Sequence, residues 1–279
     1  STPKPSSAAS DVYKRQLYDL KGVIYRMKRT SKELKRIARD ILNDRYRVPM
    51  AAFAATTLIA TVIESPFSFS MGDNPTNMQL VISLIAELLI SVVSFVLGCG
   101  VAKIHLSMTR GNDFRIRDIF DPFKKNTDRF FIAGFLFLLM IFVSMIPVIG
   151  GFTYAVIADF SVVSIVIAAA TGILSLILSC YFMLTYHFIG YITLDHPELK
   201  CLEVFKECRL LMHGNRLRLL YILLSFIGYG LLVLCSFGIA SLWVVPYQTE
   251  TLVIFYLDCT DELNRIPVRS YEKTATTQF

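Results

Sequence analysis

The sequence predicts an all-α integral membrane protein, a bundle of about six transmembrane helices with basic amphipathic helices at the membrane surface. Hydrophobic residues make up 54% of the 279 residues and charged residues only 18%, which is too apolar a composition for a water-soluble domain of this length. The loops between apolar blocks either are rich in Lys and Arg or contain neither. Because Lys and Arg are retained on the cytoplasmic side, this alternation predicts orientation as well as fold.

The net charge of +6 raises the question of an acidic partner. The basic residues lie beside apolar blocks rather than along one extended polar surface, so we expect anionic lipid headgroups as the counter-charge and no nucleic acid. The six cysteines have neither CxxC nor His/Cys ligand spacing, which argues against a disulfide framework and a zinc site. No Gly-rich phosphate loop is present, so we expect no cofactor.

The first residues of the chain differ from the rest in composition. Residues 1–16 are small, polar and without hydrophobic periodicity, so we expect residues 1–26 to be a disordered or non-native extension and the native protein to begin at Met27. Residues 27–260 then form a single transmembrane domain, and residues 261–279 form a cytoplasmic tail.

Residues 31–46 carry Leu34, Ala38 and Ile41 at helical spacing among basic side chains. This pattern predicts an amphipathic helix that lies on the membrane surface. The first apolar block follows at residues 48–63, and the loop at residues 64–77 has no Lys or Arg. We therefore expect this loop on the extracytoplasmic side.

The second apolar block, residues 78–102, is long enough to cross a hydrocarbon core of roughly 30 Å. Residues 103–129 are strongly basic and are therefore expected in the cytoplasm. The third block covers residues 130–149, and we expect it to end at Pro147 and the Gly150–Gly151 pair, since these residues form turns.

Residues 152–194 are apolar over twice the length of a normal span. The loop after them is basic, so an odd number of crossings is required, and we predict one helix at about residues 162–186. Residues 219–256 are expected to form a hairpin broken near residues 236–238, which gives six spans with both termini in the cytoplasm. Five spans, with one long last helix, remain the alternative.

A weak threefold internal repeat supports the count of six. Three segments each consist of a basic amphipathic stretch that leads directly into an apolar helix, and each precedes a predicted hairpin. They begin near residues 31, 117 and 202. Each repeat would supply one surface helix and two spans.

Several short motifs resemble a bacterial family known only as a domain of unknown function, number 975. They are residues 27–39 (MKRTSKELKRIAR), 118–120 (DIF), 123–124 (FK), 146–147 (IP), 191–197 (YITLDHP), 212–216 (MHGNR), 225–229 (SFIGY), 238–239 (GI), 242–243 (LW), 246–247 (PY) and 255–256 (FY). The resemblance implies a multi-helix integral membrane protein. No activity is established for this family, so the resemblance identifies no catalytic residue in this chain. The chain departs from the family in Tyr229, where Trp is common, and in an apolar insertion between Pro147 and Tyr181.

Two ionisable residues in apolar blocks are candidates for an intramembrane polar site. Glu87 lies in the middle of the second block, where a carboxyl group costs about 2.5 kcal/mol or more unless it is paired, protonated or hydrated. It could bind a proton or a cation, or it could hydrogen-bond between packed helices. His187, near the cytoplasmic end of the fourth block, is its candidate partner, although interfacial anchoring is an ordinary role for such a residue.

Pro246 and Tyr247 lie inside the last apolar stretch and form a candidate helix break. A proline there removes one backbone N–H and frees a carbonyl. Broken helices of this kind build substrate sites in transporters, whereas a simple kink or turn is the more common outcome.

We favour a non-enzymatic protein of the bacterial cytoplasmic membrane that acts in transport or in the assembly of membrane proteins. Its partners would be other membrane proteins or further copies of itself. A transporter would bring Glu87, His187 and Pro246 into one cavity, whereas an assembly component would present helix faces of small residues. The alternative is a membrane-embedded enzyme or accessory domain that acts on lipid headgroups, with polar residues gathered at the cytoplasmic interface. No catalytic or metal-binding residue is assigned.

Overall fold

The computed structural model describes residues 28–70 and 76–265, and all of its regular elements are helices. The helices are α2 (Ser31–Leu42), α3 (Arg47–Ser70), α4 (Asn77–Thr109), the short 3-10 helix η1 (Ile116–Phe123), α5 (Thr127–Ile157), α6 (Val162–Tyr186), α7 (Ile189–Asp195), α8 (Cys201–Met212), α9 (Arg216–Leu224), α10 (Ile227–Cys235) and α11 (Ser241–Cys259). The predicted extension at residues 1–26 and most of the predicted tail lie outside the described residues.

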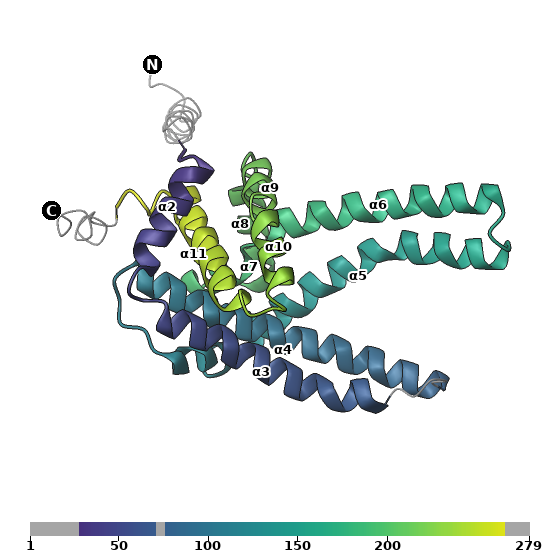
Figure 1. The fold of residues 1–279 in the computed structure, drawn as a ribbon, viewed down its shortest axis with the longest axis horizontal. Coiled ribbons are helices and arrows are strands. Elements are labelled where there is room, and N and C mark those ends of the chain that lie inside the picture. Colours follow the sequence, from purple (N-terminus) through teal and green to yellow (C-terminus); the bar gives the residue numbers. More distant parts are fainter. Residues whose placement is uncertain (1–27, 71–75, 266–279) are drawn as a thin grey trace, which may run out of the picture.

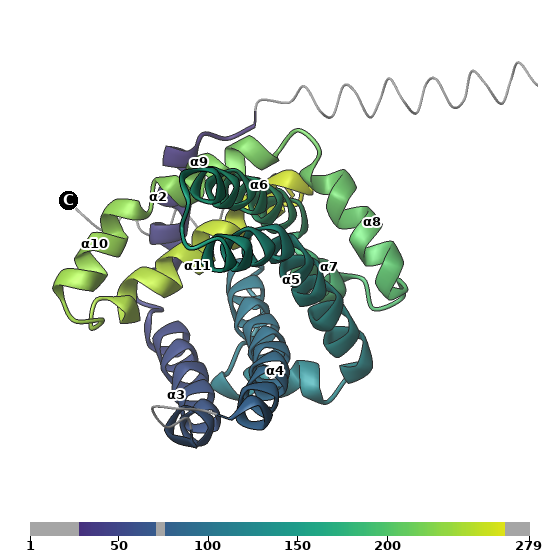
Figure 2. The same cartoon turned by 90° about the vertical axis from the view of Figure 1, so that its right-hand side faces the viewer.

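Two long helical hairpins, α3/α4 and α5/α6, run along the longest axis of the molecule and diverge from a common base (Figure 1). The base consists of α2, α7 to α11 and the ends of the hairpin helices that contact them. Viewed along the hairpins, α8, α10 and α11 lie across the view while α5 and α6 are seen end-on (Figure 2).

Five helical segments of the described chain are long and apolar enough to cross a membrane. They are Arg47–Phe67, Asn77–Thr109, Thr127–Ile157, Val162–Asp195 and Arg216–Cys235. This confirms the all-α, multi-pass membrane fold. The predicted sixth span, α11, is not among them, because its polar residues make it less apolar than the other five. It is also largely enclosed by protein. The number of crossings made by α11 stays a prediction.

Some predicted boundaries were correct. Helix α6 covers Val162–Tyr186, as the parity of the basic loops predicted. The last apolar stretch is broken where predicted, because α10 ends at Cys235 and α11 begins at Ser241, and the first arm of this hairpin consists of α9 and α10. Short helices precede the three hairpins as α2, η1 and α8, an order that agrees with the repeat. The third hairpin, α9–α10/α11, runs across the other two (Figure 1).

Two predicted boundaries were wrong. Helix α3 continues through residues 64–70, which were expected in a loop. Helix α5 passes through Pro147 and the two following glycines to end at Ile157. Ser175 of α6 accepts a hydrogen bond from the Val148 N–H at 3.0 Å, and a Cβ at Gly151 would meet Thr171 of α6. These residues therefore join α5 to α6 rather than forming a turn.

Helix α2 differs from the expected membrane-surface helix. Its apolar face, with Leu34, Ala38 and Leu42 all fully buried, packs against the protein, chiefly on α11. Only its basic face is left exposed, with Lys32, Arg36 and Arg39 among its residues. A capping box begins the helix, since the Thr30 hydroxyl accepts from the Glu33 N–H and the Glu33 carboxylate accepts from the Thr30 N–H.

The main hydrophobic core lies in the base, around α11. The aromatic rings of Phe188, Tyr191, Phe255 and Tyr256 pack together there, with centroids 5.2 to 5.8 Å apart. Six consecutive residues of α11, residues 252–257, are at most 7% exposed. A helix buried on all sides by other helices is stabilised by packing.

Close packing of α4 on η1 predicts different effects for two neighbouring glycines. A Cβ at Gly100 would lie 2.0 Å from the Ile119 carbonyl oxygen, whereas a Cβ at Gly98 meets nothing within 4 Å. We expect Gly100→Ala to lower the free energy of unfolding by about 1–3 kcal/mol. Gly98→Ala should leave it unchanged or slightly raise it, because alanine favours helix. Denaturant titration in mixed micelles measures both, and equal effects would contradict the packing.

Candidate functional site

A buried polar cluster joins α4 to α11 in the base. The Nδ1 atom of His105 lies 2.7 Å from Oε2 of Glu250, and the Thr109 hydroxyl donates to Oε1 of the same carboxyl group at 2.5 Å. His105 and Glu250 are fully buried, and Thr109 is 2% exposed. Residues 105 and 109 are one helical turn apart, so both side chains face α11 from the same side of α4.

One polar atom of this cluster lacks a hydrogen-bond partner among the described residues. Both carboxyl oxygens of Glu250 have a partner, but Nε2 of His105 is buried without a hydrogen-bond partner among the described residues. Buried polar atoms are nearly always paired, and this ring nitrogen is one of four buried side-chain atoms without a partner among the described residues.

One residue further along, Arg110 forms an ion-pair network at the end of α4. Its guanidinium group makes two hydrogen bonds to Asp195, at 2.7 and 2.8 Å, and two to Glu262, both at 2.7 Å. The Tyr256 hydroxyl donates to Asp195 at 2.9 Å. Hydrogen bonds that the guanidinium group donates to the two carboxylates raise the pKa of Arg110 above its usual value. The network ties α4, α7 and the end of α11 together.

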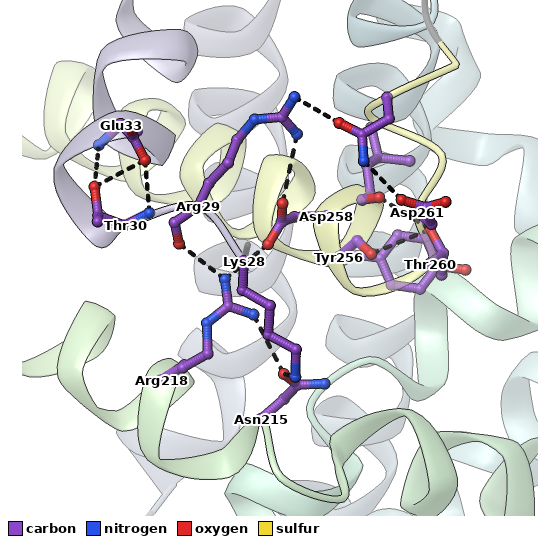
Figure 3. Close-up of polar contacts among 12 residues, drawn as sticks. Lys28, Arg29, Thr30, Glu33, Asn215, Arg218, Tyr256, Asp258, Thr260 and Asp261 are labelled. Atoms are coloured by element: carbon purple, nitrogen blue, oxygen red, sulfur yellow. Dashed lines mark hydrogen bonds and ion pairs between the residues drawn. The ribbon is translucent and has the colours of Figure 1, made fainter. Parts of the chain in front are cut away.

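A second charged network fixes the first described residues to the base (Figure 3). Asp258 accepts from Arg218 at 2.7 Å and from Arg29 at 3.4 Å. Arg218 also donates to the Arg29 carbonyl oxygen at 2.9 Å, and Lys28 donates to the Asn215 side chain at 2.7 Å. The Asp258 side chain is only 6% exposed, so these contacts neutralise a nearly buried carboxylate.

Arg129 holds the loop that follows α7. Its guanidinium group donates to the backbone carbonyl oxygens of His196, Pro197 and Leu199 at 3.0, 2.6 and 2.5 Å. These carbonyls follow the last turn of a helix, where backbone acceptors lack intrahelical partners. The motif at residues 191–197 is therefore a structural unit, in which the helix end is capped from α5.

A polar pocket of about 280 Å³ opens beside Arg110. Lys103, Asp121, Lys125 and Asn126 are among the residues that line it. Lys103 donates to Asp121 at 2.5 Å, and this hydrogen bond lowers the pKa of Asp121. Two of the three cations that line the pocket, Lys103 and Arg110, are already paired with carboxylates, so Lys125 is the lining cation left without an ion pair among the described residues. No group of three His, Cys, Asp or Glu in the described residues could hold a metal ion.

Glu87, a predicted site residue, lies away from the base. It is exposed on α4 and lines an apolar groove of about 760 Å³ between α4 and α5. Ser91, one turn further along α4, is the other polar residue of the groove. No side chain in the described residues hydrogen-bonds to Glu87.

His187 and the Pro246–Tyr247 pair are placed elsewhere. His187 follows the last turn of α6, and its ring contacts Phe188 with centroids 5.0 Å apart. Helix α11 runs through Pro246 without interruption, so the predicted break is absent. The Tyr247 hydroxyl donates to the Lys35 carbonyl oxygen at 3.4 Å. No hydrogen bond or ion pair among the described residues joins these positions to Glu87.

The sequence interpretation missed the His105–Glu250 pair. Glu250 lies within the last apolar stretch, and an ionisable residue there is a functional candidate by the argument applied to Glu87. Its partner could not be identified, because the two residues are 145 positions apart and no local pattern links them.

A family model with the description "Protein of unknown function (DUF975)" matches residues 27–262. No curated protein and no solved structure matches the chain. The match covers the whole base and both hairpins.

The Arg110 network should contribute measurably to stability. Arg110→Met leaves Asp195 and Glu262 without their shared cation, and we expect the free energy of unfolding to fall by about 2–3 kcal/mol. Arg117→Met is the matched control, because Arg117 is an exposed residue of η1 and its replacement should change stability by less than about 0.5 kcal/mol. Denaturant titration of both variants tests this, and equal losses would show that the network does not stabilise the base.

Proposed function

Because the chain belongs to the family described as DUF975 proteins of unknown function, its role has to be inferred from its structure, and we propose that it is a non-enzymatic assembly component of the membrane. In this proposal, the groove between α4 and α5 receives a transmembrane helix of another membrane protein. The observation that carries the proposal is the pair of diverging hairpins with an apolar groove, in which the Glu87 carboxyl group has no hydrogen-bond partner among the described residues.

The walls of the groove are suited to a helix. Leu84 and Ile85 of α4 and Phe142 of α5 are 67%, 56% and 58% exposed. Such a continuous apolar surface is rare on a protein unless lipid or a partner covers it. Within a bilayer, helices associate through close packing and interhelical hydrogen bonds rather than through hydrophobicity alone.

Glu87 favours a helix over lipid as the occupant. It stands ten residues into α4, about 15 Å along the helix and so close to the middle of a roughly 30 Å hydrocarbon core. Acyl chains cannot hydrogen-bond to a carboxyl group, and placing a carboxyl group at that depth costs about 2.5–3.5 kcal/mol. A partner helix with a Ser, Thr, Asn, Lys or Arg at the same level would supply the missing hydrogen bond. Ser91, one turn away on the same face, extends this polar strip.

Transport is less well supported. A transporter of the expected type would bring Glu87, His187 and Pro246 into one cavity, but these residues lie in separate surroundings. An enzyme acting on lipid headgroups would need a cluster of free polar residues at the interface, whereas the cations of the pocket beside Arg110 are largely paired.

The base is proposed to face the cytoplasm of a bacterial cell, with the molecule in the cytoplasmic membrane. Lys103, Arg110, Lys124 and Arg129 all lie at the base end of the hairpins, whereas the turn at residues 158–161, at their far end, has no Lys or Arg. The exposed basic face of α2 would then contact anionic lipid headgroups.

Site-specific photo-crosslinking in intact cells tests the proposed function. A photoreactive amino acid at Phe142 should give a discrete protein adduct. The same reagent at Leu176, on α6 outside the groove and 63% exposed, should give none. Replacement of Glu87 by Leu should reduce the Phe142 adduct at least fivefold, because a lost intramembrane hydrogen bond is worth about 1 kcal/mol or more.

Other crosslinking results would either contradict the proposal or change the identity of the occupant. Adducts with lipid alone, or equal protein adducts at the two positions, would contradict the proposal. An adduct of twice the mass of the chain would identify a second copy as the occupant and would exclude a different partner protein.

A further inference from the structure

The buried pair His105–Glu250 is independent of the α4–α5 groove and needs its own explanation. Both side chains are fully buried, their nearest atoms are 2.7 Å apart, and the free ring nitrogen Nε2 has no partner among the described residues. We propose that the pair is a proton-binding site inside the bundle and that Nε2 of His105 is the atom that takes up and releases the proton.

The hydrogen bonds determine where the exchangeable proton can be. A distance of 2.7 Å between Nδ1 and Oε2 requires one proton in that contact. Oε1 accepts the single Thr109 hydroxyl proton at 2.5 Å, in preference to the His105 carbonyl oxygen at 3.0 Å. The remaining position is Nε2. With Nε2 unprotonated, the pair has one proton and a net charge of −1; with Nε2 protonated, it has two protons and is neutral overall.

Neither state is fully stabilised by its surroundings. In the described residues no Lys or Arg pairs with Glu250, so the deprotonated pair leaves a net negative charge in the interior, which is unfavourable. In the protonated pair, the Nε2–H group is a buried donor without an acceptor. Each state therefore leaves one group incompletely satisfied, whereas full satisfaction of one state would oppose proton exchange.

The other ionisable groups near the pair do not take up or release the proton in its place. Tyr46, before α3, and Tyr191 of α7 lie close enough to interact with the charge of Glu250, and Cys99 of α4 adjoins Tyr191. Arg39 of α2 and Tyr229 of α10 act on Tyr46. Tyrosine and cysteine are protonated and neutral near pH 7. The ionisable residues of α3, Arg47 and Glu64, lie at its start and in its distal half.

The consequence concerns α11. Among the described residues, the Glu250 carboxyl group hydrogen-bonds to His105 and Thr109, both of α4, so a change in the charge of the pair alters the attraction between α11 and α4. Proton binding at Nε2 strengthens the pair, because it places an imidazolium beside the carboxylate. The site would therefore bias the packing of α11 in the base.

Nitrogen-15 NMR of the full chain in lipid nanodiscs, with labelled histidine, tests the proposal. The chain has four histidines, and His105→Asn identifies the signals of His105. We expect Nε2 of His105 to change between its protonated and unprotonated chemical shifts as pH is raised, while Nδ1 stays protonated. In Glu250→Gln, loss of the carboxylate should lower the proton affinity of His105 about tenfold or more.

The matched control is Glu198→Gln. Glu198 lies 3.0 Å from His196 in an exposed pair, so its replacement should change the titration of His196 and leave that of His105 unchanged. If Glu250→Gln fails to fold, the titration of the wild-type protein alone still shows whether Nε2 of His105 binds and releases a proton. A single protonation state of Nε2 across the pH range in which the protein stays folded would overturn the proposal. A titration of Nδ1, or a midpoint unaffected by Glu250→Gln, would also overturn it.

Discussion

The arrangement of the base depends on one requirement: α11 carries polar side chains into the interior, and each of them needs a partner there. Glu250 is paired with His105 and Thr109 of α4, and Asp258 with Arg29 and Arg218. An unpaired buried carboxylate would cost several kcal/mol. Because the partners come from α4, α9 and the segment before α2, the position of α11 fixes the relative positions of elements that are far apart in the sequence.

This central position of α11 also explains why the hairpins diverge. Among the contacts that the described residues show, the charged networks lie in the base, where α11 and the Arg110 network join α4 to α7. Beyond the base, α5 and α6 are joined to each other by Ser144, Ser175 and Ser179. No comparable polar contact joins α4 to α5 in the described residues beyond the base. Among the described residues, the two hairpins are therefore held together at one end, and the groove between them is the proposed binding site for a partner helix.

The alternation of charged and uncharged loops was sufficient to predict the fold class, the range of α6 and the break between α10 and α11, because it reflects the cost of placing Lys and Arg in lipid or across it. The end of α5 was mispredicted, since Pro147 acts there together with the Ser175 hydroxyl of another helix. The burial of α2 was missed because an apolar helix face has the same pattern whether it meets lipid or protein. The sequence placed Glu87 in a transmembrane helix, but only the tertiary structure could place it in a groove and pair His105 with Glu250.

Residues 252–257 of α11 are enclosed by protein, whereas the exposed apolar side chains of α10 would face lipid in a bilayer. A carbene reagent that partitions into the bilayer would test this on the wild-type protein, with labelled peptides mapped by mass spectrometry. We predict strong labelling in α10, where Leu231, Leu232 and Leu234 are 61%, 54% and 75% exposed, and almost none at residues 252–257 of α11. Labelling of those α11 residues at the level found for α10 would contradict the account.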